Sequence, residues 1–195
     1  MNKKYYNIHA DKNGEYFYLN DYIPKNKKIP FDYEVHKHSE RILKYKKGDP
    51  RMIAFFVKIL NNIIYNYFYF YDLILPVPPS NSYLDVYPNA IACSYISSVG
   101  TMDTFEGAII CSKGHKPGHI ENFVSKKIDL KNIFVVNKYD FEHKNIIILD
   151  DIITTGNTFS YIKKALLKRG ANSVAGLFLG KTYSSGGIIE EDFNG

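Results

Sequence analysis

Hydrophobic positions along the chain predict several helices. After Asp49, apolar residues fall at positions 53, 56, 57, 60, 63 and 64, which lie on one face of a helix. Asp49 followed by Pro50 is typical of a helix N-terminus, so we expect the helix to begin there. Residues 39–47 predict a short helix that ends at Gly48, and residues 88–99 predict a further helix that ends at Gly100.

Short apolar runs predict the strands of a buried sheet. They comprise residues 73–75, 105–111, 133–136, 146–149 and 173–179. The last two flank a helical pattern over residues 158–169 that ends at Gly170, and such a strand-helix-strand unit indicates parallel strands. Residues 1–40 alternate aromatic and polar positions and predict short strands and loops. We therefore expect an α/β fold with a parallel sheet flanked by helices, in a single domain (1–195) with a core at 41–182 and an appendage at 1–40.

The composition places the chain among ordinary globular proteins. Hydrophobic residues make up 45% and charged residues 23%, and no apolar run reaches the roughly 20 residues that cross a bilayer. The first residues lack the apolar block of a secretory signal, so we expect a cytoplasmic protein that does not enter a membrane. Cys93 and Cys111 have no CxxC spacing, which favours reduced thiols over a zinc site.

The net charge of +5 is concentrated in the first third of the chain. Residues 1–60 hold 13 Lys and Arg against 7 Asp and Glu. A basic region with tyrosines beside lysines suits single-stranded DNA, on which aromatic rings stack. A general bias of the sequence towards Lys, Asn, Ile and Tyr explains the same charge without a nucleic acid, and the composition favours a core role for the tyrosines.

The segment at residues 145–158, NIIILDDIITTGNT, carries the clearest chemistry. Asp150 and Asp151 follow a buried strand, and paired carboxylates can accept hydrogen bonds from the 2' and 3' hydroxyls of a ribose. The next residues open a helix with backbone N–H groups and hydroxyls, which suit a phosphate. They are Thr154, Thr155, Gly156, Asn157 and Thr158. Taken singly, an aspartate after a strand is commonly a cap, and a Thr-Gly pair is common in turns.

Four aliphatic residues, two acids, two more aliphatics and TTGNT, in this order, resemble the phosphoribosyl pyrophosphate motif of type I phosphoribosyltransferases. The resemblance implies that Asp150 and Asp151 hold the ribose hydroxyls and that residues 154–158 hold the 5'-phosphate. It also implies a pyrophosphate loop after an early strand, a mobile loop over the reaction and a hood that reads the base, here within residues 1–40. Mg²⁺ would be carried by the ligand's oxygens and water, with Asp150 or Asp151 contacting it through water.

Two further loops match the parts that this resemblance implies. The pyrophosphate loop falls on Val77, Pro78, Pro79 and Ser80. Its prolines remove two N–H donors, which leaves Val77, Ser80 and Asn81 as candidates, and an X-Pro bond here is compatible with a cis peptide. A proline-rich turn that merely ends a strand is the alternative.

The mobile loop falls on KGHKPGH at residues 113–119, where Lys113 and Lys116 would neutralise the leaving pyrophosphate, as a catalytic contribution. A flexible polar loop is equally compatible with this composition.

Within this family the chain is most similar to the competence protein F group. The similarity rests on ILKYKKG (42–48), DLILPVPPS (72–80), residues 113–119, NIFVV (132–136) and the long motif. DVYPN (85–89) replaces the Arg-Gly-Phe-Asn stretch of that group, and its N-terminal zinc-binding cysteines are missing. The resemblance implies phosphoribosyl transfer between pyrophosphate and a nucleobase or related acceptor. The alternatives are a non-catalytic module that binds single-stranded DNA or a partner, and a regulator that senses phosphoribosyl pyrophosphate.

Three other features have simpler interpretations. AGLFLGKT (175–182) fits a loose nucleotide-binding P-loop, but its centre reads as a buried strand. His115 and His119 have a ligand-like spacing, yet Pro117 and Gly118 prevent a helix that would present both to zinc. Lys44, a further candidate for a phosphate, is expected on a solvated helix face.

Overall fold

The computed structural model describes residues 8–25, 33–79, 87–111, 130, 133–136 and 138–183. Within them a six-stranded sheet has the order β1-β2-β8-β7-β4, and β3 also pairs with β8. The strands of this sheet are β1 (His9–Ala10), β2 (Tyr16–Tyr18), β3 (Asp21–Tyr22), β4 (Leu73–Pro76), β7 (Asn145–Ile153) and β8 (Ser173–Thr182). The helices are α1 (Tyr33–Lys46), α2 (Pro50–Tyr67), α3 (Pro88–Ser98) and α4 (Asn157–Leu167).

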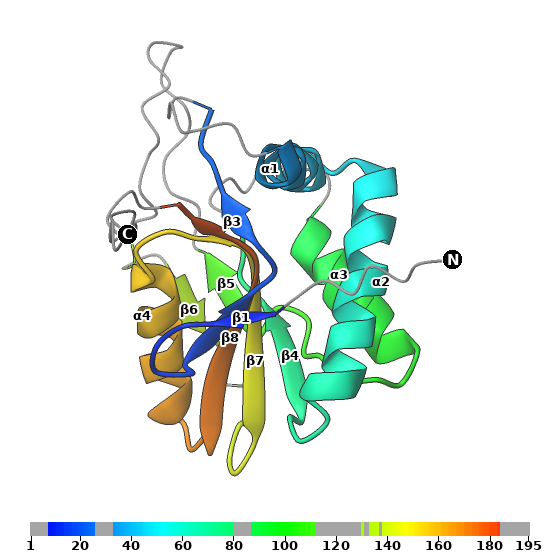
Figure 1. Cartoon of the computed structure of the whole chain (residues 1–195). Helices are drawn as coiled ribbons and strands as arrows, with labels where there is room; N and C mark the ends of the chain where they lie inside the picture. The colour runs from blue at the N-terminus through cyan, green and yellow to red at the C-terminus, as the bar shows by residue number, and fades with distance from the viewer. Residues whose placement is uncertain are drawn as a thin grey trace, which may run out of the picture.

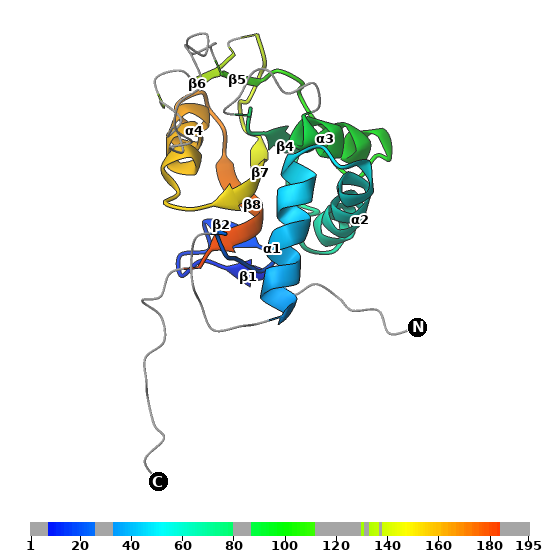
Figure 2. The ribbon, with the colours of Figure 1, turned by 90° about the horizontal axis from the view of Figure 1, so that it is seen from above.

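The sheet is parallel except for β1, which runs antiparallel to β2. In its centre β7 pairs with β4 on one side and with β8 on the other. Helices α1, α2 and α3 lie on one face, and α4 lies on the opposite face, beside a small sheet of β5 (Ile109–Cys111) and β6 (Ile133–Val135) (Figures 1 and 2). The predicted α/β fold, a parallel sheet flanked by helices, is confirmed.

The buried side chains of β7 alternate between two cores. Ile147 and Leu149 belong to the core under α1, α2 and α3, whereas Ile146 and Ile148 belong to the core under α4. All four are completely buried. This explains why the strand reads as a continuous apolar run, because a parallel strand covered on both faces has no polar side.

The start of α2 follows the sequence prediction. Asp49 caps the helix, and its Oδ1 accepts hydrogen bonds from the backbone N of Arg51 (2.9 Å) and Met52 (3.2 Å). Pro50 stands at the first helical position, where its missing N–H costs nothing. The helix therefore begins where expected, and its apolar face contributes to the core under α1, α2 and α3.

Helix α1 begins earlier than the predicted residue 39. Its first half buries polar residues, which hides the helical period from a hydrophobic pattern. The ring Nε2 of His38 hydrogen-bonds the Leu179 carbonyl at 2.7 Å, and Ser39 Oγ accepts from the Ile23 N–H at 2.9 Å. Burial lowers the pKa of His38, which favours the neutral ring in this position.

Two groups of predicted short strands have partners that the sequence pattern does not give. The short strands expected near the start of the chain are present, but β2 and β3 extend the main sheet by pairing in parallel with β8. The strands expected at 105–111 and 133–136 are shorter, and they pair antiparallel with each other rather than in the main sheet. Partner choice depends on contacts between distant segments, which a local pattern does not contain. Among the helices of the described ranges, none has the length and apolarity needed to cross a membrane.

Candidate functional site

A cavity of about 610 Å³ lies beyond the carboxyl ends of β4 and β7, and it gathers most of the predicted site residues. Its walls include Val77, Pro78, Pro79, Asp150, Asp151, Thr154, Thr155, Gly156, Asn157 and Thr158. Ligands of open parallel sheets bind at this edge, where loops and helix N-termini converge. Ser80, Asn81, Lys113, His115, Lys116 and His119 lie outside the described residues.

The two acids lie within a strand, not at its end as predicted. β7 continues past them to Ile153, still paired with β8. The alternation of its side chains reverses here, because Ile152 packs against the core under α1, α2 and α3 while Ile153 belongs to the core under α4. Pairing with β4 stops at Leu149. Asp150 and Asp151 thus occupy an irregular point of the strand, where their side chains line the cavity.

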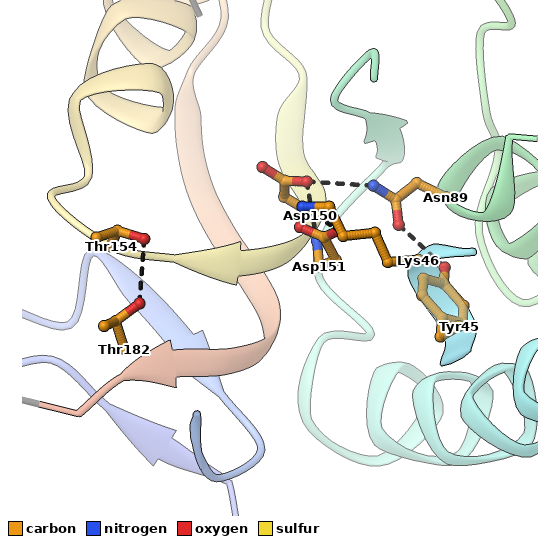
Figure 3. A network of polar contacts seen from close by, with 7 residues as sticks. All are labelled: Tyr45, Lys46, Asn89, Asp150, Asp151, Thr154 and Thr182. Carbon is orange, nitrogen blue, oxygen red and sulfur yellow. Dashed lines mark hydrogen bonds and ion pairs between the residues drawn. The ribbon is translucent and has the colours of Figure 1, made fainter. Parts of the chain in front are cut away.

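Each acid has its own partner from a helix (Figure 3). Asp150 Oδ1 accepts hydrogen bonds from Asn89 Nδ2 at 3.2 Å and from the Asp151 N–H at 2.8 Å. Asp151 Oδ2 forms an ion pair with Lys46 Nζ at 3.1 Å. Asn89 belongs to the first turn of α3, and Lys46 is the last residue of α1. The acid pair is therefore held between three separate elements.

A buried tyrosine fixes the orientation of Asn89. Tyr45 Oη donates to Asn89 Oδ1 at 3.0 Å, and both side chains are almost fully buried. With its carbonyl oxygen engaged by Tyr45, the Asn89 amide presents its NH₂ group to Asp150. Burial, followed by the nearby Cys93 and the two acids, raises the pKa of Tyr45 well above its usual value, so it stays a donor.

The surroundings of the site shift the pKa values of Asp150 and Lys46 for different reasons. Burial and then the adjacent Asp151 raise the pKa of Asp150 well above its usual value, against the opposing effects of its hydrogen bonds and Lys46. Burial alone would lower the pKa of Lys46, but the attraction of Asp151 and Asp150 outweighs it and the pKa is raised. Lys46 is thus a firmly protonated cation beside the acid pair.

The loop between β7 and α4 leaves the start of the helix uncapped. Gly156 precedes the helix in the left-handed conformation (φ 75°), and no side chain accepts a hydrogen bond there as an N-cap. The Asn157 N–H makes only a long contact of 3.5 Å with Thr155 Oγ1. Thr154 Oγ1 lies 3.1 Å from Thr182 Oγ1, which ties the loop to the end of β8 (Figure 3). Uncapped N–H groups at a helix N-terminus favour an anion.

The proline segment corrects one prediction. The Val77 N–H donates to the Leu149 carbonyl at 2.9 Å and extends the pairing of β4 with β7, so it is not free for a pyrophosphate. The peptide bonds of the described residues, which include Pro78 and Pro79, are trans rather than cis. Pro78 and Pro79 have no N–H to donate. Residues 77–79 therefore offer no free N–H to an anion, and the remaining candidates of this loop, Ser80 and Asn81, lie outside the described residues.

Sequence reasoning missed Lys46, Asn89, Tyr45 and Tyr87, all of which line the cavity. The stretch LKYKKG offers three lysines, and its spacing does not show which one faces an acid far along the chain. Lys44, the lysine considered in the sequence, is exposed and is absent from the cavity wall. AGLFLGKT lies in the extended strand β8, which confirms that it is not a P-loop.

The acid pair suits a hard cation only in part. The described residues contain no group of three or more His, Cys, Asp or Glu side chains arranged to hold a metal ion. Two carboxylates fit Mg²⁺ if the ligand supplies the remaining oxygens, as Mg²⁺ commonly requires with phosphates. Lys46 already occupies one oxygen of Asp151. A magnesium ion at this site would depend on the ligand for most of its coordination.

No protein-family model and no curated protein matches the sequence. Among solved structures, the fold is similar to a purine phosphoribosyltransferase from Pyrococcus horikoshii, with 17% identity over 67% of this chain and 83% of that one (TM-score 0.43). It is also similar to a phosphoribosylpyrophosphate synthetase from Mycobacterium smegmatis, with 20% identity over 63% of this chain and 33% of that one (TM-score 0.38). A hypoxanthine phosphoribosyltransferase from Staphylococcus aureus matches at 16% identity over 75% of this chain and 74% of that one (TM-score 0.37). At these values the likeness assigns no activity, and function has to be argued from the cavity.

Proposed function

We propose that this chain binds phosphoribosyl pyrophosphate with Mg²⁺ and is a phosphoribosyltransferase that transfers the phosphoribosyl group to or from a nucleobase or related acceptor. The observation that supports it is the cavity that joins the acid pair of β7 to the uncapped N-terminus of α4. One end offers carboxylates to hydroxyl groups, and the other offers N–H groups to a phosphate. A ribose 5-phosphate carries both kinds of group.

Each part of the ligand has a place in this proposal. Asp150 and Asp151 accept hydrogen bonds from the 2' and 3' hydroxyls, and residues 154–158 hold the 5'-phosphate. The pyrophosphate lies on the side of the cavity that Pro78 and Pro79 line, and the next residues along the chain, Ser80 and Asn81, are its candidate donors. The presence of the acid pair and of residues 154–158 on one cavity wall supports these assignments.

The reaction would displace pyrophosphate from the anomeric carbon through a cation-like state, with the acceptor nitrogen forming the new bond. Mg²⁺, when bound, would neutralise the pyrophosphate oxygens as the C–O bond breaks. The protein's contribution is to hold the ribose in position and to stabilise positive charge on the sugar through the two carboxylates.

The acid pair gives the direct test. A variant with Asp150→Ala and Asp151→Ala is expected to lose binding of phosphoribosyl pyrophosphate, measured by calorimetry with Mg²⁺, while its circular dichroism spectrum stays folded. Asp103→Asn is the control, because Asp103 is exposed and lies outside the cavity. Affinity unchanged in the double variant would remove this site assignment. Pyrophosphate release against a panel of bases then separates an enzyme from a sensor, which would bind without turnover.

A second candidate is a module that binds single-stranded nucleic acid away from the cavity. Four strongly exposed aromatic residues gather around the end of α2, at Tyr65, Tyr67, Tyr69 and Phe70. Tyr69 and Phe70 are in edge-to-face contact, and exposed rings can stack on unpaired bases. A gel-shift titration at rising salt tests this candidate, because binding that is absent at low salt excludes it.

A further inference from the structure

Only a few residues of the cavity wall, among those that the structure describes, carry a charge. Among the lining residues that the structure describes, Asp150 and Asp151 are the acids and Lys46 is the single Lys or Arg. A sugar phosphate is an anion, and its phosphate would share one cavity with the acid pair. Binding therefore needs a positive charge close to the acids, either from the protein or from a metal ion.

Lys46 provides a positive charge beside the acid pair. It ends α1, and its Nζ lies 3.1 Å from Asp151 Oδ2. The side chain of Asp151 is only 15% exposed, whereas that of Lys46 is 52% exposed. Asp151 thus holds one side of the ammonium group, and the lysine remains open to a ligand. An ammonium group has three N–H donors, so the ion pair does not exhaust it.

A divalent ion at the same carboxylate would compete with this lysine. Two cations at one oxygen of Asp151 repel each other, and Lys46 already takes Oδ2. We propose that Lys46 is a built-in cation of the cavity, interchangeable with Mg²⁺, which lets the site bind a sugar monophosphate without any metal ion. This inference rests on the proposed function, because it concerns the same ribose and phosphate positions.

Two lysines of α1 provide a matched comparison. Lys46→Met removes the charge at the acid pair and keeps the aliphatic chain, whereas Lys44→Met removes a charge from an exposed position outside the cavity. Lys46→Arg keeps the charge. Each variant is titrated with ribose 5-phosphate by calorimetry, once in EDTA and once with excess Mg²⁺, after its melting temperature has shown that it is folded. Lys46→Gln replaces the methionine variant if that one does not fold.

The expected result is a metal dependence that appears only when the charge at position 46 is lost. The unchanged protein, Lys44→Met and Lys46→Arg bind ribose 5-phosphate in EDTA. Lys46→Met binds it about tenfold more weakly in EDTA, since one charge-assisted contact is lost, and regains most of that affinity in Mg²⁺.

Four results would overturn the inference. Lys46→Met that binds in EDTA as tightly as Lys44→Met would show that the charge is not used. A loss that Mg²⁺ does not reduce would show that lysine and metal are not interchangeable. Binding by the unchanged protein only in Mg²⁺ would exclude metal-free binding but leave the proposed function standing. No binding of either ribose 5-phosphate or phosphoribosyl pyrophosphate under both conditions would remove the proposed function as well.

Discussion

The two halves of β7 belong to one strand but differ in their strand pairing and in the direction of their side chains. Residues 145–149 pair with a neighbour on each side, and their apolar side chains alternate between two cores. Residues 150–153 pair only with β8, and the alternation of their side chains is reversed. The first half is determined by burial, and the second half by what its polar groups contact.

The difference shows how one continuous segment can serve two purposes. The buried half pairs in register with two neighbouring strands. This pairing fixes the position of the acids that follow it. The second half, no longer held by β4, can turn carboxylates towards Asn89 and Lys46. We therefore expect substitutions in the first half to change stability most, and substitutions in and after the second half to change binding.

The largest expected effect is in the buried half. Ile147→Ala should lower the free energy of unfolding by about 2–5 kcal/mol, because it removes a completely buried side chain and leaves a cavity. Urea denaturation measures this loss. Ile152→Ala is the matched control in the other half, where the side chain is only partly buried and has less contact to lose. Equal losses for the two variants would contradict the comparison.

An intermediate effect is expected at the loop that follows the second half. Gly156→Ala should cost about 1–2 kcal/mol of stability, because a side chain is strained at φ 75°. It should also weaken binding of ribose 5-phosphate by shifting the N–H groups at the start of α4. Gly14→Ala provides the control: Gly14 has a similar φ of 67° and open space around it, but it lies outside the cavity. If both variants bind alike, the loop does not hold the phosphate.

The smallest effect is expected at Asp150, where a substitution should raise stability rather than lower it. Its pKa in the folded chain is raised by burial and by Asp151, so between the usual carboxyl pKa and the raised value the folded state holds more protons than the unfolded state. The contribution of Asp150 to stability therefore falls as pH rises from about 4. Asp150→Asn removes this pH-dependent loss of stability. The melting temperature of the variant should exceed that of the unchanged protein at pH 7, and the difference should shrink towards pH 4. Asp103→Asn, at an exposed position outside the cavity, is the control.

Local patterns were sufficient for the elements whose determinants are local. Asp49 and Pro50 identify the start of α2, and the apolar run before Asp150 identifies β7. The acid pair and the loop after it were found because they are adjacent in the sequence. The start of α1 was missed because His38 and Ser39 are buried polar residues, whose partners, Leu179 and Ile23, are supplied by the tertiary structure.

The parts that could not be predicted all depend on distant contacts. Lys46 reaches Asp151 from α1, and Asn89 reaches Asp150 from α3, so their roles exist only after the helices have packed. The Val77 N–H looked available because its acceptor, the Leu149 carbonyl, lies on another strand. Sequence spacing identified the ligand-facing groups of one segment, but it did not identify the groups that orient or neutralise them.

The position of β8 has a consequence for how the chain folds. This strand is central, and it pairs on one edge with β7 and on the other with β2, where Tyr16 faces Gly176. On the ribosome, the segment around Tyr16 emerges long before its partner has been synthesised. Until β8 is made, β2 can pair only with β1, and its other edge stays open. Such a high contact order is associated with slow folding. The open edge of this early, aromatic strand is one that a chaperone would have reason to cover during synthesis.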